Sequence, residues 1–215
     1  VNNELVTYII DTTVAGIELK YFIQILSSNR IKKIIHSSSQ DLEAFISLKG
    51  CKKINNLEDT QLMCEFCGDE QLSYSNAVAK YMKIINFEKD KNIQVSDWKK
   101  RPLTEEQIEY AKNDVFYLID LYNVLSKKLI EENKFDFYKN EMKYFLKRQT
   151  VDYFIENYWK KLKFDIHKIS YNDLELVKKI SSWREEKAIN NNVSRSLIFE
   201  NNLLIKLVKE KPSTK

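Results

Sequence analysis

The chain has 215 residues, of which 43% are hydrophobic and 31% are charged, a balance that supplies a core for one domain and a smaller second one. Its net charge of +4 permits a polyanionic partner without requiring one. We find no signal peptide and no long apolar run, which argues against a secreted or membrane-bound protein. With only three cysteines, we therefore expect a protein of the reducing cytoplasm.

The first two apolar runs, Leu5–Ile10 and Ile31–Ile35, predict β-strands. A polar turn follows the second run, and Asp41 opens a helix that ends at Gly50. Asp41 is thus expected beside the carboxyl end of a strand, where ligands bind in open α/β sheets, and the helix dipole favours its ionised form. Taken alone, Ser38 and Asp41 also fit a helix-capping box, and that interpretation is favoured.

Two cysteines, Cys64 and Cys67, have a spacing that is found in zinc and redox sites. A structural zinc ion needs four ligands, and the sequence has no second pair of this kind. We therefore interpret both as structural thiols on a short helix between Asp59 and Gly68. His36 is likewise interpreted as a turn residue rather than a metal ligand.

A capped helix is predicted to begin at Thr104. Thr104 and Gln107 have the spacing of a capping box, and an apolar stripe at helical period continues to about Leu129. Tyr110 and Asp114 are four residues apart and therefore adjacent on this helix, where they can share one bound water. An isolated pair at this spacing is more often a core aromatic and a solvated carboxylate.

The rest of the chain is predicted to be helical. A break near 133–136 separates the capped helix from helical periodicity over 138–162, and 166–171 interrupts the pattern again. An amphipathic helix then spans 172–188.

Four segments, in this order and spacing, together resemble ribonuclease D. They are Ile35-His36-Ser37-Ser38-Ser39-Gln40-Asp41-Leu42-Glu43, Asp59-Thr60-Gln61-Leu62, Ser96-Asp97-Trp98-Lys99-Lys100-Arg101-Pro102-Leu103-Thr104 and Tyr110-Ala111-Lys112-Asn113-Asp114. The resemblance covers the chain from about residue 5 to about residue 150. It implies an α/β, ribonuclease H-like fold with sheet order 3-2-1-4-5, and a DEDDy 3′–5′ exonuclease that uses two divalent metal ions.

The resemblance also implies the catalytic residues. Asp41 and Asp114 correspond to metal ligands of the family, and Tyr110 to the tyrosine that positions the attacking water. Hydrolysis by two hard cations ~3.5–4 Å apart requires several carboxylates, because one cation activates water and the other steadies the leaving oxygen. Magnesium and manganese prefer such oxygen ligands, so Mg²⁺ or Mn²⁺ is the expected cofactor.

One motif of the family is missing. The family has an Asp-x-Glu on its first strand, whereas the strand-like run that ends at Asp11 has Thr13 in the glutamate position. Asp11 precedes Asp41 by 30 positions, too few for the first motif, and matches the aspartate after the family's third strand. We therefore interpret residues 1–11 as a third strand and its turn. We expect both predicted strands to lack direct partners, and a separate N-terminal segment to supply the first motif.

The sequence Trp183-Arg184-x-x-Lys187-Ala188 resembles the beginning of an HRDC domain, a helical module of RecQ-type helicases and ribonuclease D. That module has more helices than the two or three expected here, so both ends of the chain are expected to be shortened. The resulting domains are an N-terminally truncated exonuclease domain over 1–148, a helical linker over 149–167 and a partial, all-α HRDC domain over 168–215.

A basic segment, residues 80–101, has a net charge of +4 and leads into the capped helix. Lys99, Lys100 and Arg101 at its end are candidates for contact with the phosphate backbone of RNA. A solvated loop in a lysine-rich protein explains the same charges equally well.

The resemblance thus implies a 3′–5′ exoribonuclease that acts on RNA 3′ ends, with tRNA precursors as the expected substrate. The chain alone is expected to be inactive, because each metal site loses carboxylates with the first motif. Two alternatives stay open: a non-catalytic RNA-binding remnant, and an inert product of gene decay.

Overall fold

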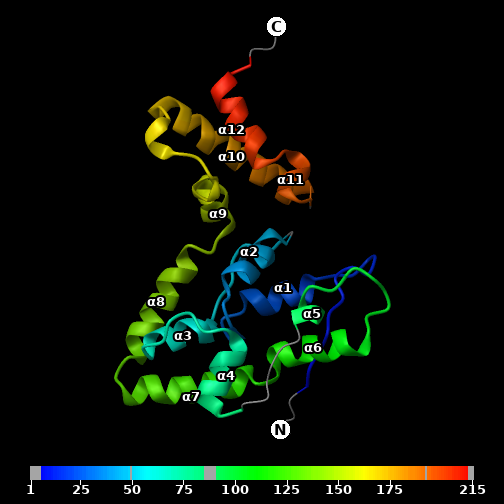
Figure 1. Ribbon diagram of the computed structural model, residues 1–215, viewed down its shortest axis with the longest axis vertical. Helices are drawn as coiled ribbons and strands as arrows, with labels where there is room; N and C mark the ends of the chain where they lie inside the picture. The colour runs from blue at the N-terminus through cyan, green and yellow to red at the C-terminus, as the bar shows by residue number, and fades with distance from the viewer. Residues whose placement is uncertain (1–5, 49, 85–90, 192, 213–215) are drawn as a thin grey trace. The chain divides into compact units, whose positions relative to one another are not determined.

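The computed structural model describes residues 6–48, 50–84, 91–191 and 193–212. Figure 1 shows its helices, and the two strands in the described residues are short. In chain order these are α1 (Lys20–Ser27), β1 (Lys33–Ile35), α2 (Ser39–Ser47), β2 (Leu57–Asp59), α3 (Thr60–Phe66), α4 (Tyr74–Met82), α5 (Lys91–Gln94), α6 (Glu105–Phe116), α7 (Leu118–Glu131), α8 (Phe135–Lys147), α9 (Val151–Asn157), η1 (Tyr158–Lys161), η2 (Ile166–Lys168), α10 (Tyr171–Asn191), α11 (Arg195–Ile198) and α12 (Asn201–Glu210).

The chain divides into two compact units. Unit 1 comprises Val1–Phe22, Asn29–Ser38 and Asn56–Tyr144, and unit 2 comprises Ile23–Ser28, Ser39–Asn55 and Phe145–Lys215. Each unit has its own buried core. Across the described ranges, we find no helix with the length and apolar character needed to cross a lipid bilayer.

The sheet of unit 1 consists, in the described residues, of the parallel strands β1 and β2. Ile34 is in register with Glu58, and Ile35 with Asp59. The expectation that the strand at 31–35 lacks a direct partner is therefore wrong. Its partner has only three residues, too few to give a periodic signal in the sequence.

The strand predicted at 5–10 is also wrong over the described residues 6–10, which form no strand. Tyr8 is 82% exposed and Val6 is 61% exposed, so this run is not buried against the core. A strand needs a neighbour to take up its backbone hydrogen bonds. In the described part of the chain, only β1 and β2 form a sheet.

Helix α7 organises the core of unit 1, where it packs against α3, α4 and β1 (Figure 1). Its buried residues recur every three or four positions and form one apolar stripe: Leu118, Leu121, Tyr122, Leu125 and Leu129. Burial of each such large side chain contributes about 1.5–3 kcal/mol. This stripe is the second half of the one predicted from the sequence.

The single helix predicted from Thr104 to about Leu129 is in fact two helices, α6 and α7, which meet at Tyr117. The backbone N–H of Tyr117 donates to the hydroxyl of Tyr74 at 3.0 Å. This long-range bond lies at the junction of the two helices. A periodic pattern cannot reveal it, since the apolar stripe continues through both helices.

The break predicted near 133–136 is confirmed, because α7 ends at Glu131 and Asn133 has a left-handed backbone with φ of 55°. The helical region predicted over 138–162 is divided between α8, α9 and η1. A second interruption follows: η2 and a short non-helical link precede α10. The helix predicted at 172–188 lies within α10 and is confirmed.

Unit 2 is built around α10, which packs against α9, η1, α11 and α12. Its core residues come from these elements and the short loop after η1: Tyr158, Leu162, Val177, Leu204 and Val208. Residues 39–55 also belong to this unit, and Lys53 forms a single antiparallel bridge with Thr150.

The short helix predicted around the cysteine pair is α3, and all three cysteines are free thiols. Cys64 is buried, and burial together with the nearby charge of Asp69 raises the pKa of its thiol to about 12. A thiol with so high a pKa is a poor nucleophile and metal ligand at neutral pH.

Candidate active site

The helix that carries Tyr110 and Asp114 begins with the predicted capping box. The hydroxyl of Thr104 accepts the N–H of Gln107 at 3.2 Å, and the side-chain oxygen of Gln107 accepts the N–H of Thr104 at 3.0 Å. The side-chain amide of Gln107 also donates to the hydroxyl of Ser96 at 2.9 Å, which ties the preceding loop to α6. Local sequence therefore sets the start of α6 and hence the face that Tyr110 and Asp114 share.

Tyr110 is half-buried against the indole of Trp98, with ring centroids 5.9 Å apart. Burial, together with the negative charge of Asp114, raises the pKa of Tyr110 above its ordinary value. Burial and the same carboxylate raise the pKa of Tyr74 to about 12. The phenol of Tyr110 therefore keeps its proton at neutral pH and can donate a hydrogen bond.

Asp41 lies in the first turn of α2, as predicted, and its side chain is exposed. It belongs to unit 2, whereas Tyr110 and Asp114 lie together on α6 in unit 1. The structure thus brings two of the three candidate catalytic residues together. A joint site of all three stays a prediction.

Asp59 shapes the turn that precedes α2, a role that sequence reasoning missed. Its buried carboxylate accepts the N–H groups of Ser37 and Ser38 at 3.0 and 2.8 Å, and the hydroxyl of Ser38 at 2.7 Å. It also caps α3 by accepting the N–H of Gln61 at 2.9 Å. These bonds hold Ser37 in a left-handed conformation, with φ of 63°.

The signal that could have revealed this role is an aspartate at the end of a strand and directly before a helix, where N-cap residues occur. His36, in the same turn, hydrogen-bonds to the hydroxyl of Thr60 at 2.9 Å and to the carbonyl of Leu72 at 3.0 Å. These contacts agree with its interpretation as a turn residue.

The three candidate RNA-contacting residues differ in their surroundings. Lys99 and Lys100 are exposed. The guanidinium of Arg101 forms two hydrogen bonds with the carboxylate of Asp11, at 2.6 and 2.7 Å. Among the other charges of the segment, Lys80 pairs with Asp69.

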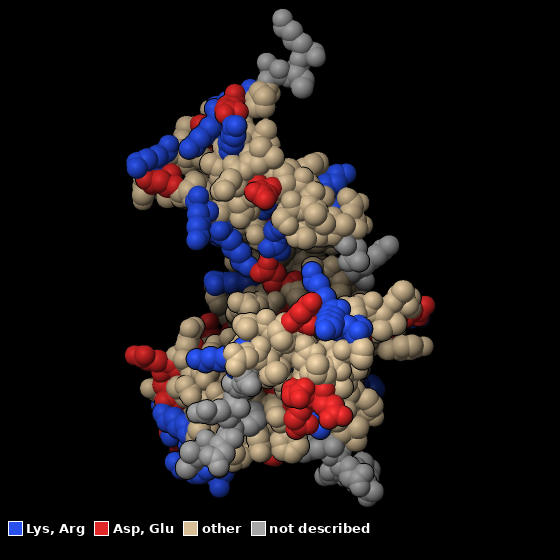
Figure 2. All heavy atoms as spheres, turned by 45° about the vertical axis from the view of Figure 1, so that its right-hand side comes forward, with Lys and Arg blue, Asp and Glu red and all other residues tan. Residues whose placement is uncertain are grey.

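The charged residues Glu88, Lys89 and Asp90 of this segment lie outside the described residues. The face drawn in Figure 2 carries both basic and acidic side chains. For contact with RNA, the local arrangement of charges therefore matters more than the net charge of the chain.

A metal site needs several ligand side chains close together. Within the described ranges, no three side chains of His, Cys, Asp or Glu lie close enough together to hold a metal ion. Asp41 and Asp114 have the oxygen donors that Mg²⁺ and Mn²⁺ prefer, but a site for either ion needs more oxygen ligands than these two supply. The described residues therefore do not complete a metal site by themselves.

Comparison with known proteins shows the family to which the chain belongs. The family model of 3′–5′ exonucleases matches residues 1–130, well over half of the chain. The chain belongs to the 3′–5′ exonuclease family. A second family model, that of the HRDC domain, matches residues 173–215. The predicted α/β exonuclease fold followed by an all-α HRDC module is thus confirmed, and this exonuclease family generally uses divalent metals.

Two curated relatives of this chain are bacterial ribonuclease D proteins. That of Bartonella henselae is 33% identical over 96% of this chain and 50% of the relative. That of Nitrobacter hamburgensis is 28% identical over 96% of this chain and 53% of the relative. The chain spans about half the length of the curated relatives it matches.

A solved structure agrees with these sequence relatives. The crystal structure of Escherichia coli RNase D, described as an exoribonuclease involved in structured RNA processing, has a TM-score of 0.70 and 25% identity. The match covers 92% of this chain and 52% of that protein. The predicted resemblance to ribonuclease D is therefore confirmed by sequence and by fold.

Proposed function

We propose that this chain is part of a ribonuclease D-like 3′–5′ exoribonuclease, in which Tyr110, Asp114 and Asp41 are the catalytic residues. The observation that carries the proposal is the pair on α6: a protonated phenol beside a carboxylate, on a helix whose start is set by a capping box. The phenol can hold an attacking water by a hydrogen bond. Asp41 and Asp114 are oxygen ligands for Mg²⁺ or Mn²⁺.

The remaining carboxylates, in this proposal, come from a separate N-terminal segment that carries Asp-x-Glu. An exposed apolar hollow of about 340 Å³ in unit 1 supports this idea, because such a segment can pack against it. Val115, Phe116 and Ile119 line the hollow and are 46%, 50% and 46% exposed. Large exposed apolar groups that lie together mark interaction surfaces.

The proposed substrate is the 3′ end of RNA, with tRNA precursors as the specific class. The named activity of the E. coli relative in structured RNA processing supports this choice. The proposed compartment is the cytoplasm, which the three free thiols support.

We also propose domain limits of 1–148, 149–167 and 168–215. The family matches at 1–130 and 173–215 support them. Limited proteolysis followed by mass spectrometry tests the boundary before the third region, with cleavage expected in the exposed stretch at 165–168.

The decisive experiment follows the shortening of a 5′-labelled RNA from its 3′ end, with Mg²⁺ or Mn²⁺ and with EDTA. The pure chain is expected to show little or no activity, and co-expression with a segment carrying Asp-x-Glu is expected to restore it. In the restored enzyme, Asp41→Asn and Asp114→Asn should each remove nearly all activity, whereas Tyr110→Phe should have a milder effect.

The matched control is Asp136→Asn, an exposed aspartate in the first turn of α8. If all three site substitutions leave the rate within a factor of about two of the control, the catalytic assignment is wrong. Robust metal-dependent activity of the pure chain would contradict the need for a second segment. RNA binding without restored activity would favour the non-catalytic alternative.

A further inference from the structure

A small cavity in unit 2 contains neither Tyr110 nor Asp114 in its lining and has the chemistry of a nucleotide site. It has a volume of about 290 Å³ and is lined by the first turns of α2, the loop at 148–149, α9 and η1. Its size is at the lower end of the range for small-molecule pockets. Every residue that lines it belongs to unit 2.

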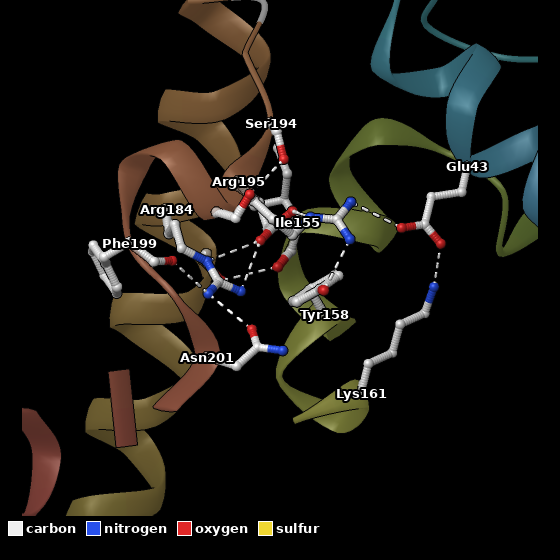
Figure 3. A network of polar contacts seen from close by, with 12 residues as sticks. Glu43, Ile155, Tyr158, Lys161, Arg184, Ser194, Arg195, Phe199 and Asn201 are labelled. Atoms are coloured by element: carbon white, nitrogen blue, oxygen red, sulfur yellow. Dashed lines mark hydrogen bonds and ion pairs between the residues drawn. The ribbon is translucent and has the colours of Figure 1, made fainter. Parts of the chain in front are cut away.

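The lining of this cavity is positively charged. Arg148, Lys160 and Lys161 line it and are exposed, whereas Glu43 is its acidic lining residue. Glu43 is bound on one side by Lys161 and on the other by Arg195, whose guanidinium lies 2.8 Å from it. Figure 3 shows Glu43 between these two cations.

These two contacts keep Glu43 ionised and compensated. Burial acts to raise the pKa of Glu43, but the hydrogen bonds from Lys161 and Arg195 outweigh burial and hold that pKa below its ordinary value. The acidic residue is therefore neutralised inside the protein. An anion in the cavity would meet a net positive lining.

Lys160 is the cation best placed for a ligand. Its ammonium group donates to the side-chain oxygen of Asn157 at 2.6 Å and has no carboxylate partner in the described part of the chain. An amide oxygen satisfies one of its three donors and leaves its charge uncompensated. A phosphate oxygen can take up the other two donors.

Tyr153 supplies an aromatic face in the same cavity. Its ring is half-buried, and its backbone N–H is fixed by the hydroxyl of Thr150 at 3.2 Å, which caps α9. Across the described residues, neither its hydroxyl nor its ring has a hydrogen-bonding or stacking partner. An aromatic ring beside cations is the arrangement that binds single-stranded nucleic acid.

We propose that this cavity binds one nucleotide of single-stranded RNA, with the base stacked on Tyr153 and the phosphate held by Lys160. The proposal rests on the proposed function, since it assigns the substrate strand a second contact site outside the catalytic residues. A free mononucleotide offers the same base and phosphate, so the test distinguishes a nucleotide within an RNA strand from a free mononucleotide.

The experiment uses the full chain in EDTA, so that no RNA is hydrolysed. Anisotropy of a 5′-fluorescent single-stranded RNA is measured over a range of salt concentrations. Tyr153→Ala should weaken binding by roughly five- to a hundredfold, and Tyr153→Phe, which keeps the ring, by less than about twofold. Lys160→Ala should reduce the slope of log K against log salt by about 0.7.

The matched control is Lys179→Ala, which removes an exposed lysine of α10 that does not line the cavity. Thermal unfolding followed by circular dichroism verifies that each variant is folded. A second arm titrates the ¹⁵N-labelled chain with uridine 5′-monophosphate, and shifts are expected for the amides of 148–161.

Weaker RNA binding by Tyr153→Ala and Lys160→Ala, but not by the control, supports the proposal. If the RNA binds and all variants match the control, the cavity is not the site, while the proposed function stands. If the mononucleotide shifts these amides but RNA does not bind, the cavity is a mononucleotide site and the RNA proposal fails. If neither RNA nor the mononucleotide binds, the cavity is neither an RNA site nor a mononucleotide site.

Discussion

Arg101 and Asp11, 90 residues apart in the sequence, form a two-pronged ion pair. Nε of Arg101 donates to Oδ2 of Asp11 at 2.6 Å, and Nη2 donates to Oδ1 at 2.7 Å. The hydrogen bonds from Arg101, with those from Thr13, hold the pKa of Asp11 well below its ordinary value. A depressed pKa means that the pair is intact at neutral pH and is lost only as the pH falls through that low value.

The pair bears on the candidate RNA contacts, because a guanidinium held in this way is less available to phosphate. We expect the double variant Lys99→Ala, Lys100→Ala to reduce the slope of log K for RNA binding against log salt by up to about 1.4. Each lost contact with a single strand accounts for about 0.7. Arg101→Ala should add little. Fluorescence anisotropy at several salt concentrations measures the slopes.

The complementary variant is Asp11→Asn, which releases Arg101 and should steepen the slope by up to about 0.7. The reverse ranking, with Arg101→Ala costing more than the two lysines together, would show that the guanidinium leaves Asp11 to bind RNA.

Asp59→Asn should destabilise unit 1. The buried carboxylate of Asp59 accepts hydrogen bonds from Ser37, Ser38 and Gln61 on both of its oxygens, and an amide would turn an N–H₂ group toward one set of these donors. We expect a loss of about 3 kcal/mol in the free energy of unfolding, measured with urea.

The control for Asp59 is Asp97→Asn. Asp97 accepts the backbone N–H of Lys99 at 3.0 Å in an exposed turn. Its substitution should cost less than about 1 kcal/mol. Equal losses at the two positions would mean that Asp59 is no more than an ordinary turn residue.

The electrostatic coupling between Tyr110 and Asp114 can be measured directly. A negative neighbour opposes ionisation of a phenol, so Asp114→Asn should lower the pKa of Tyr110, and that of Tyr74 should fall with it. NMR of tyrosine labelled with ¹³C at Cζ, with Tyr110→Phe for assignment, reports both values. Asp136→Asn should leave both pKa values unchanged. If the pKa of Tyr110 is also unchanged in Asp114→Asn, the side chains of Tyr110 and Asp114 are not electrostatically coupled.

Arg195 should be important for the stability of unit 2. Its guanidinium contacts the buried Glu185 at 3.0 Å. It also contacts the hydroxyl of Tyr158 at 2.8 Å and Glu43 at 2.8 Å (Figure 3). Arg195→Ala leaves Glu185 with Arg184 alone, and we expect the unfolding free energy to fall by about 2–4 kcal/mol. Urea unfolding followed by circular dichroism measures it.

Arg195→Lys should lower the unfolding free energy nearly as much as Arg195→Ala, because an ammonium group cannot reach three partners in a plane as a guanidinium does. Lys206→Ala is the control: Lys206 and Glu210 form an exposed pair 3.8 Å apart, so its loss should cost less than about 1 kcal/mol. Full stability of Arg195→Lys would show that charge alone matters here.

Short-range signals determined several features of this protein from its sequence. The cap at Thr104 and Gln107, the break after α7 and the helix α10 follow from residues within a few positions of one another, so local hydrogen bonding and periodicity were enough to predict them. The same holds for the shared face of Tyr110 and Asp114, since residues four apart on a helix are always neighbours.

Tertiary structure decided the features that depend on distant partners. The pairing of β1 with β2 and the left-handed turn at Ser37 both involve Asp59, about twenty residues away. The junction between α6 and α7 depends on the hydroxyl of Tyr74, and the exposed Arg101 pairs with Asp11. In each case a long-range polar contact selects one of several backbone or side-chain arrangements that are locally close in energy, and no pattern of neighbouring residues encodes that choice.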